Sequence, residues 1–325
     1  MALNILVTGG TGSFGQEFIT QLLEQEPDPD DRIVVYSRDE RKQEDMAAKF
    51  GHNPRLRFFL GDVRDKDRLT MAVRGVDTIV HAAALKVVPS LEYNPMEAVK
   101  TNVIGTQNLL EAIHEANYSY PTRLIALSTD KAVSPTNLYG ATKLCLEKLV
   151  VAYNNVDPQY HIASVVRYGN VAFSRGSVIP KFIYQRDSGQ RLSVTDERMT
   201  RFWITLTDAA QLVMDRLDDM EGGEIFIPNM PSFRVVDLAQ VLTGKLDYDV
   251  IGMRPGEKLH ESIISQDEWH KGYFDRTRSL YVISDGPTPA GCERLAGPLD
   301  SSTRIMPVYE LAELLREGGW TRSKL

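Results

Sequence analysis

A glycine-rich turn between an apolar run and a helical pattern constrains the fold of this chain most strongly. The run Ile5–Thr8 leads into Gly9-Gly10-Thr11-Gly12-Ser13-Phe14-Gly15, after which apolar residues recur at helical spacing. Glycines in such a turn let the backbone approach a pyrophosphate at the helix N-terminus. Because the Gly-x-Gly-x-x-Gly spacing lies between a strand and a helix, it predicts a dinucleotide-binding turn. The expected cofactor contacts there are Gly9, Thr11, Gly12, Ser13, Phe14 and Gly15.

Short β-rich runs alternate with helical patterns through the first half of the chain. Five further runs are expected to be strands: Ile33–Ser37, Leu56–Leu60, Thr78–His81, Leu124–Ser128 and Ile162–Val166. Strands that alternate with helices form βαβ units. We therefore expect the α/β class, with a Rossmann-type, doubly wound parallel sheet.

The pattern loosens after about Arg167, where polar, glycine-containing segments alternate with helical stretches. Helices are expected near Leu206–Leu217, Val235–Leu242 and Val308–Arg316. We predict an NADP-binding Rossmann domain over residues 1–167, with a return segment near 200–220. A smaller, partly interleaved substrate-binding region would comprise residues 168–199 and 221–325.

Composition excludes several classes of partner. The 325 residues carry a net charge of −7, which argues against a nucleic-acid partner held by charge. No apolar run approaches the roughly 20 residues that span a bilayer, and the first apolar run resembles a buried strand more than a signal peptide. With only Cys145 and Cys292, the chain suits a reducing cytoplasm. The terminal Ser323-Lys324-Leu325 matches a peroxisomal address, but a three-residue match arises easily by accident.

The end of the second expected strand bears on the choice between NAD and NADP. Ser37 and Arg38 come first there, and Lys42 follows one helical turn later. A hydroxyl, a guanidinium and an ammonium suit a 2′-phosphate, which favours NADP. In the alternative, Arg38 and Lys42 are solvated charges and Asp39 holds the ribose hydroxyls of NAD.

Two further strand ends carry cofactor candidates. Asp62 and Val63 follow the third strand, where an Asp can accept a hydrogen bond from the adenine amino group; an N-cap is the structural alternative for Asp62 or Asp65. Small side chains at Ala82, Ala83 and Ala84 follow the fourth strand and would let a cofactor pass close to the backbone, unless they form a packing seam.

Two acid–base pairs lie close together in the sequence. Tyr139 and Lys143 are four residues apart and so share one helix face, where the ammonium can lower the pKa of the phenol. Just upstream, Thr129-Asp130-Lys131 adds a second pair. One pair suits oxidation of an alcohol, whereas two pairs indicate a further step on the oxidised substrate.

The glycine-rich turn and the Tyr-x-x-x-Lys pair resemble an extended short-chain dehydrogenase/reductase. Over residues 3–265 the chain is similar, more narrowly, to the C5-inverting UDP-N-acetylglucosamine 4,6-dehydratases of pseudaminic acid synthesis. The segments that carry this resemblance include 36–40, 61–65, 81–86, 92–95, 128–131, 137–143, 167–170, 174–177, 199–203 and 256–261. The resemblance implies NADP, a nucleotide-sugar substrate and a homo-oligomer.

The resemblance also implies roles for the two pairs. Tyr139, with a pKa lowered by Lys143 and the nicotinamide charge, would take the O4 proton while Thr129 hydrogen-bonds O4. Hydride would leave C4 and later return to C6. Lys131 would act as base at C5, provided that its pKa is brought down, and Asp130 would protonate the departing O6.

Substrate contacts are expected from residues on both halves of the chain. Lys86 follows the fourth strand, Asn170 resembles a diphosphate contact, and Arg201 and Arg254 could bind a diphosphate or form salt bridges between the two regions. Glu257 could accept from the ribose or fix Arg254. No metal site is expected.

The chain departs from the family pattern at several positions. Val87 stands where the family has His, Ser134 where it has Asn and Phe173 where it has Gly; the tail near Leu299 and Arg304 also differs. The first three positions lie beside expected pocket segments, so they bear on the identity of the sugar and on the C5 configuration.

Three alternative functions stay open at this point. A nucleotide-sugar 4-epimerase would use Tyr139 and Lys143 without Asp130 and Lys131, and a second enzyme would stop at a 5,6-ene. An NADP-sensing regulatory module would keep the fold, although such modules lose the Tyr.

Overall fold

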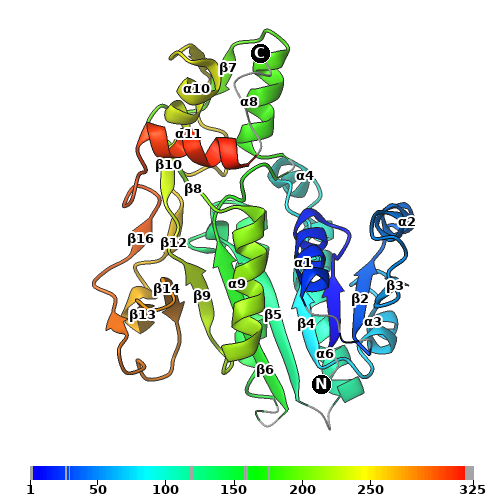
Figure 1. Ribbon diagram of the computed structural model, residues 1–325. Helices are drawn as coiled ribbons and strands as arrows, with labels where there is room; N and C mark the ends of the chain where they lie inside the picture. Colours follow the sequence, from blue (N-terminus) through cyan, green and yellow to red (C-terminus); the bar gives the residue numbers. More distant parts are fainter. Residues whose placement is uncertain are drawn as a thin grey trace.

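A ten-stranded sheet runs through the computed structural model, which describes residues 3–318 except 26, 27, 29, 118–120, 157, 159 and 175 (Figure 1). Its strand order is β15-β13-β14-β9-β6-β5-β4-β1-β2-β3. The strands from β9 to β3 in that order are parallel, and β14, β13 and β15 extend the sheet antiparallel. The bounds of the parallel strands are β1 Asn4–Thr8, β2 Arg32–Ser37, β3 Leu56–Leu60, β4 Thr78–His81, β5 Thr122–Thr129, β6 His161–Tyr168 and β9 Ile225–Pro228. The antiparallel strands are β13 Gly272–Asp275, β14 Leu280–Ile283 and β15 Glu293–Arg294.

This topology confirms the expected Rossmann-type sheet. All six strands expected from the sequence are present, and their spatial order, 3-2-1-4-5-6, is the one typical of dinucleotide-binding folds. The direction of winding reverses between β1 and β4, which places a crevice at the carboxyl ends of these two strands. The division into domains stays a prediction, although β9, β13, β14 and β15 join the large sheet from within residues 221–325.

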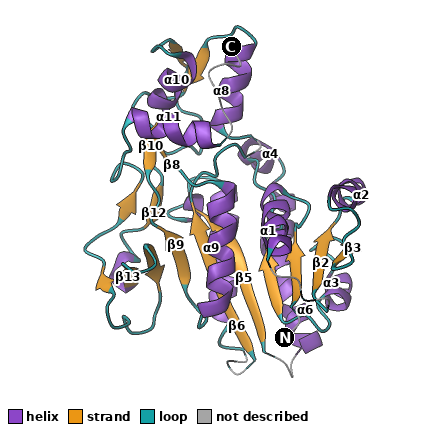
Figure 2. Cartoon of the chain, in the orientation of Figure 1, coloured by secondary structure: helices purple, strands orange, loops and turns teal. Residues whose placement is uncertain are grey.

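Helices cover the sheet. Helix α1 (Ser13–Glu24) contacts α9 (Leu206–Asp219), and both lie in front of the sheet in Figure 1. Helix α6 (Gly105–Asn117) lies behind the strands and contacts α3 (Lys66–Ala72) and α7 (Leu138–Tyr153). The remaining helical segments of this half are α2 Glu40–Lys49, α4 Val88–Tyr93, α5 Pro95–Ala98, a π-helical stretch Val99–Ile104 and a 3-10 turn Asp130–Ala132 (Figure 2).

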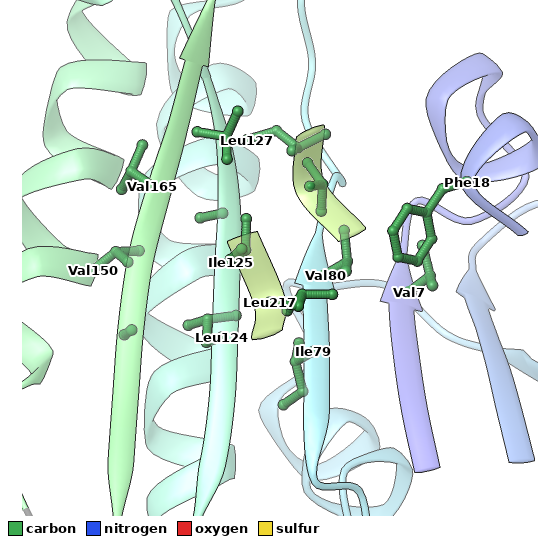
Figure 3. Packing of buried hydrophobic residues seen from close by; sticks show 14 of the residues in the cluster. Val7, Phe18, Ile79, Val80, Leu124, Ile125, Leu127, Val150, Val165 and Leu217 are labelled. Atoms are coloured by element: carbon green, nitrogen blue, oxygen red, sulfur yellow. The ribbon is translucent and has the colours of Figure 1, made fainter. Parts of the chain in front are cut away.

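The main core lies between the sheet and these helices. Figure 3 shows strand residues such as Ile79, Ile125 and Val165 with Phe18 of α1 and Val150 of α7. All five are fully buried. Because helices cover both faces, the parallel strands are almost continuously apolar, and this explains why their sequences could be recognised. The core fixes the strand ends that carry the candidate site.

A second apolar cluster lies beyond the carboxyl ends of the strands, at the top of Figure 1. It joins α8 (Val178–Asp187), α10 (Val235–Thr243) and α11 (Val308–Glu317) to short strands. Three pairs of short strands lie outside the large sheet: β7 Leu192–Val194 with β11 Tyr248–Val250, β8 Thr200–Phe202 with β10 Ser232–Arg234, and β12 Ser262–Ile264 with β16 Leu299–Asp300. The apolar residues of the third pair pack in the main core. A 3-10 turn spans Trp269–Lys271. The helices expected near residues 206–217, 235–242 and 308–316 are confirmed as α9, α10 and α11.

Two sequence features that bear on cellular location were a membrane-spanning segment, which was not expected, and the C-terminal tripeptide. Among the residues that the structure describes, no helix combines the length and apolar character needed to cross a bilayer. The terminal Ser323-Lys324-Leu325 lies outside the described residues.

Candidate active site

A cavity of about 1170 Å³ opens at the carboxyl ends of the parallel strands. Its walls come from the glycine-rich turn after β1, from residues after β4, and from the ends of β5 and β6. Residues of α8 and of the 254–261 segment close it from the side of the second cluster. Pockets for a single small molecule measure about 300–1,000 Å³, so this cavity lies just above that range.

Most of the residues predicted from the sequence line this cavity. They are Gly9, Thr11, Gly12, Ser13, Phe14, Gly15, Lys42, Ala82, Ala84, Lys86, Thr129, Lys131, Tyr139, Lys143, Asn170, Arg201, Arg254 and Glu257. The cavity wall does not include Ser37, Arg38, Asp62, Val63, Ala83 or Asp130. Asp130 is fully buried directly between two lining residues, Thr129 and Lys131.

The glycine-rich turn leaves no space for larger side chains. Gly9 has φ +67°, and a Cβ there would lie 2.9 Å from the backbone of Ala83. A Cβ on Gly15 would lie 2.5 Å from the Cα of Gly10. Gly12 is the N-cap of α1 and supplies no capping side chain, so the first N–H groups of the helix face the cavity side of the turn. This cradle fits the pyrophosphate of a dinucleotide.

At the end of β2, the side chains expected to contact the cofactor already have partners within the protein. The hydroxyl of Ser37 accepts a hydrogen bond from Gln43 Nε2 at 3.1 Å, so it already has a partner. Asp39 caps α2 by accepting from the backbone N–H of Lys42, and its carboxylate also pairs with the Lys42 ammonium at 3.3 Å. The half-exposed Arg38 lies 3.5 Å from Asp62.

Asp62 is engaged by arginines. The guanidinium and the backbone N–H of Arg64 both donate to its carboxylate. The expected N-cap role falls to Asp65, which accepts from the N–H of Arg68 at the start of α3. Val63 is buried and packs against Gly105, while Ala83 packs against Gly9. An adenine contact of Asp62 therefore stays a prediction and would have to share this carboxylate with Arg64.

A buried hydrogen-bond chain fixes the strand ends around the crevice. The N–H of Ala83 donates to Thr8 Oγ1, which contacts His81 Nδ1 at 2.7 Å. On its other side, His81 Nε2 contacts Thr106 Oγ1 at 3.1 Å, and that hydroxyl donates to the carbonyl of Asn102. Because the Thr106 hydroxyl donates to Asn102, Nε2 of His81 carries a proton, and in the neutral ring Nδ1 accepts from Thr8. Full burial agrees, since it lowers the pKa of His81 to about 3.

Asn102 extends this scaffold to the catalytic helix. Its amide exchanges two hydrogen bonds with the backbone of Leu85, at 2.8 and 2.9 Å, and donates to Thr142 on α7. Asn102 therefore holds the segment that carries Lys86 against the helix that carries Tyr139.

Tyr139 and Lys143 lie on the first turns of α7, which begins where Asn137 accepts from the N–H of Gly140. Burial raises the pKa of Tyr139 to about 12, and the nearby cation that opposes this is Lys131. The expectation that Lys143 lowers this pKa is thus not met in the protein alone. Lys143 Nζ donates to the carbonyl of Leu127 at 2.7 Å, and burial lowers the pKa of Lys143 to about 8.

Asp130 and Lys131 form a buried pair at the end of β5. Lys131 Nζ donates to Asp130 Oδ1 at 3.0 Å and lies 3.4 Å from Glu261 Oε1. Burial alone lowers the pKa of Lys131, but the two carboxylates outweigh burial and raise it. In the protein alone, Lys131 therefore does not meet the condition set for a base, a lowered pKa. Burial, together with Glu261, raises the pKa of Asp130, as expected for a general acid.

The predicted substrate residues lie along one side of the cavity. Arg254 is exposed, and its guanidinium has no partner among the residues that the structure describes. Glu257 accepts from the backbone N–H of Arg254 and so fixes that turn. Asn170 Oδ1 is buried without a hydrogen-bond partner in the described structure. Arg201 donates to the carbonyls of Thr200 and Leu259, and its Nε lies 3.8 Å from Glu261.

Among the cavity residues that the sequence analysis missed are Lys181, Ser177 and Glu261. Lys181 Nζ donates to Ser193 at 2.6 Å, and Ser177 Oγ is buried without a partner in the described part of the chain. Glu261 ends the run 256–261 that carried part of the resemblance, yet nothing in its spacing signals contact with Lys131.

Two departures from the family pattern lie at left-handed backbone positions. Ser134 has φ +44° and Phe173 has φ +57°, where the family has Asn and Gly, the residues that tolerate this region best. The ring of Phe173 does not line the main cavity. It packs edge-on against Trp203 and lines a separate cavity of about 270 Å³. Val87 does line the main cavity.

Comparisons with known proteins agree on the family. The family model described as polysaccharide biosynthesis protein matches residues 5–281. The UDP-N-acetylglucosamine 4,6-dehydratase (inverting) of Campylobacter jejuni subsp. jejuni is 52% identical over 284 residues, which cover 86% of this chain and 82% of the relative. The UDP-glucose 4-epimerase of Rickettsia massiliae is 42% identical over 285 residues, with 86% and 82% covered.

Solved structures resemble this fold closely. Pen from Bacillus thuringiensis superposes with a TM-score of 0.89 at 33% identity, over 98% of both chains. DesIV, a dTDP-glucose 4,6-dehydratase from Streptomyces venezuelae solved with NAD bound, gives a TM-score of 0.69 at 26% identity, over 78% of this chain and 86% of that chain.

Proposed function

This chain belongs to the polysaccharide biosynthesis protein family of extended short-chain dehydrogenases/reductases, and on that premise we propose that it is a nucleotide-sugar 4,6-dehydratase. The substrate that we propose is UDP-N-acetylglucosamine, with inversion at C5, as in the name of the Campylobacter relative. One observation carries the proposal: Tyr139 and Lys143 share a cavity wall with Lys131, beside the buried Asp130. Oxidation at C4 and elimination across C5 and C6 need these two pairs together.

The proposed cofactor is NADP. The close-packed turn at Gly9 and Gly15 fits a pyrophosphate, and a bound nicotinamide would supply the hydride acceptor and donor. The use of Asp39 as the cap of α2 supports NADP over NAD, because the carboxylate at this strand end is already engaged. Arg38 and Lys42 remain as the cations that would hold the 2′-phosphate.

Tyr139 is proposed to take the proton from the sugar O4 as C4 is oxidised. In the protein alone its pKa is raised to about 12 by burial, so ionisation depends on cations brought near the ring. Lys131 opposes this rise only in part, and a bound nicotinamide would supply the further positive charge. Thr129, whose hydroxyl donates to Asp130 at 2.9 Å, lines the cavity beside Tyr139 and would hydrogen-bond O4.

Asp130 and Lys131 are proposed to carry out the elimination. When the Lys131 proton moves to Asp130 along their 3.0 Å hydrogen bond, the pair becomes a neutral amine and a carboxylic acid. The amine takes the proton from C5, which the C4 ketone has acidified. The C5–H electrons form the C5–C6 double bond as C6–O6 breaks, and O6 leaves as water with the Asp130 proton. This step regenerates the ion pair. Return to C6 of the hydride held by the cofactor when bound, and delivery of a proton to C5 on the opposite face, would complete the inverted product.

A nucleotide-sugar 4-epimerase is the second candidate, because the Rickettsia relative carries that name at 42% identity. An epimerase needs Tyr139 and Lys143 but gives the Asp130–Lys131 pair no task. A full proton-transfer pair, buried and in contact with Glu261, is costly to maintain without a task. This observation favours dehydration.

The test is incubation of the purified protein with UDP-, dTDP- and GDP-sugars, with products identified by mass and NMR. Loss of one water from UDP-N-acetylglucosamine, with inverted C5, is the expected result. An unchanged mass with inverted C4 would establish the epimerase instead. Lys131→Ala is expected to retain hydrogen exchange at C4 and to lose dehydration, and an unaffected dehydration rate would remove Lys131 from the proposal.

The proposal includes a cytoplasmic homo-oligomer. Two free cysteines, Cys145 and Cys292, suit a reducing compartment. Light scattering during size-exclusion chromatography will give the subunit number, and a monomer at micromolar concentration would contradict this part of the proposal.

A further inference from the structure

Two carboxylates flank one ammonium at the wall of the cavity. Lys131 Nζ lies 3.0 Å from Asp130 Oδ1 and 3.4 Å from Glu261 Oε1. All three side chains are largely buried, with Asp130 at 0% and Glu261 at 4% side-chain exposure. Like charges this close in a buried site compete for protons, so the protonation of one group depends on the others.

Hydrogen bonds indicate where a proton on Asp130 resides. Its Oδ1 accepts from both the Thr129 hydroxyl and Lys131 Nζ. Its Oδ2 is buried and has no hydrogen-bond partner in the part of the chain that the structure describes. The charge of an ionised Asp130 is thus compensated only at Oδ1, the oxygen that the Lys131 proton reaches when it moves to Asp130.

Glu261, unlike Asp130, has several positive charges around it. Besides Lys131, the guanidinium of Arg201 lies 3.8 Å away, and the ammonium of Lys258 adds a third positive charge nearby. Glu261 therefore stays ionised. Its Oε2 is buried without a hydrogen-bond partner among the described residues, and the residue lines the cavity.

The backbone holds Glu261 rigidly. Its N–H donates to Ser301 Oγ at 2.9 Å, and its carbonyl accepts from the N–H of Ser301 at 2.9 Å. Ser301 Oγ contacts Thr200 Oγ1 at 2.6 Å, which contacts His260 Nδ1 at 2.7 Å. These contacts join three segments of the second region, so the position of the Glu261 carboxylate is set by the fold and not by Lys131 alone.

We propose that Glu261 is a positioning residue for the Asp130–Lys131 pair: its carboxylate holds the Lys131 ammonium against Asp130 and sets the pH window in which the two groups share one proton. The inference rests on the proposed function, because the elimination needs one proton shared between this acid and this base. If the pair holds two protons, Lys131 stays charged and cannot act as a base. If the pair holds none, Asp130 has no proton to donate.

Among the residues that the structure describes, four charged or titratable groups face the pair: Glu261 and Lys258 from the 254–261 segment, Arg201 from β8 and Tyr139 from α7. Of these, Glu261 is the anion, and removing its charge lowers the proton affinity of both Asp130 and Lys131. The bell-shaped pH profile of water loss should then move as a whole to lower pH.

The experiment compares wild type with Glu261→Gln, using UDP-N-acetylglucosamine from about pH 5 to about pH 10. Water loss is followed by mass spectrometry, and oxidation at C4 separately by hydrogen exchange at that carbon. In Glu261→Gln we expect both limbs of the water-loss profile to shift down by about one pH unit or more, with C4 exchange unchanged. Glu224→Gln is the matched control, because Glu224 is also buried and hydrogen-bonded but lies outside the cavity.

The outcomes separate the two ideas. If wild type loses no water from UDP-N-acetylglucosamine, the proposed function fails. If wild type dehydrates and Glu261→Gln is slower equally at every pH, or is unchanged, the inference about Glu261 is overturned. Glu261→Asp keeps the charge and should keep both limbs in place with a slower rate. If Glu261→Gln does not fold, Glu261→Asp must still lower water loss at least tenfold relative to C4 exchange, and an unchanged ratio would overturn the inference.

Discussion

Arg167 at the end of β6 lies in a buried network whose disruption has a calculable cost. Its Nε and one terminal nitrogen donate to Glu147 at 2.9 and 2.7 Å, and the other donates to Glu268 at 2.7 Å and to the carbonyl of Ile263 at 2.9 Å. Arg167 and Glu147 have 1% side-chain exposure, and Glu268 has 21%. The network therefore ties α7, which carries Tyr139 and Lys143, to the segment after Ile263.

Replacing Arg167 by Met leaves two carboxylates without their cation. Breaking a buried pair in this way costs about 3–5 kcal/mol, and we expect a loss in that range for Arg167→Met at pH 7. Arg276→Met is the control, because its pair with Glu293 is exposed and should contribute about 1 kcal/mol or less. Urea denaturation followed by circular dichroism measures both.

Two further measurements test the role of this network. Arg167→Met combined with Glu147→Gln should recover part of the loss, because the charge left behind is removed as well. The pKa of Glu268 is raised by burial but lowered overall by Arg167, so its contribution is present at neutral pH and is lost as the pH falls through that lowered pKa. A cost below about 1 kcal/mol for Arg167→Met, or strict additivity in the double variant, would refute the account.

Four further predictions concern the cofactor side and the backbone. Tyr139→Phe should slow oxidation at C4 by about 10²- to 10⁴-fold, measured as hydrogen exchange at that carbon, and near-normal exchange would remove its role as base. Arg38→Ala should weaken NADP at least about tenfold more than NAD in calorimetric titrations; equal losses would contradict a contact with the 2′-phosphate. Burial lowers the pKa of Lys143 to about 8, so the unfolded chain binds the extra proton up to about pH 10.4 and stability should rise with pH over that interval. This rise should be absent in Lys143→Met. Ser134→Asn should stabilise the protein by about 0.5–1 kcal/mol, since Asn tolerates φ +44° better; a lower unfolding temperature would argue against backbone strain there.

The sheet could be predicted from the sequence because its signals are local. Each buried parallel strand is a short apolar run, as in Ile33–Ser37, and each is followed by a turn or a helix pattern. The extension of the sheet by β13, β14 and β15 was missed, since these strands come from a region of irregular pattern and pair antiparallel far from their neighbours in sequence. Long-range pairing leaves little trace in local composition.

The residue types of the site could also be predicted, but not the directions in which their pKa values shift. Spacing correctly placed Tyr139, Lys143 and Lys131 around one cavity. The expected lowering of the pKa values of Tyr139 and Lys131 did not hold, because burial dominates at Tyr139 and two carboxylates dominate at Lys131. One of these carboxylates, Glu261, lies 130 residues further along the chain, and no local rule connects it to Lys131.

The origin of these groups separates the two chemical steps physically. Tyr139, Lys143 and Thr129 come from β5 and α7, and the Asn102 hydrogen bonds fix them within the Rossmann half. The charges that act on the Asp130–Lys131 pair come instead from β8 and the 254–261 segment. A substitution in these segments should therefore change water loss while leaving C4 oxidation intact. Since an epimerase and a dehydratase share the first step, a chain of this fold would acquire or lose the elimination at Asp130 and Lys131 and at these two segments.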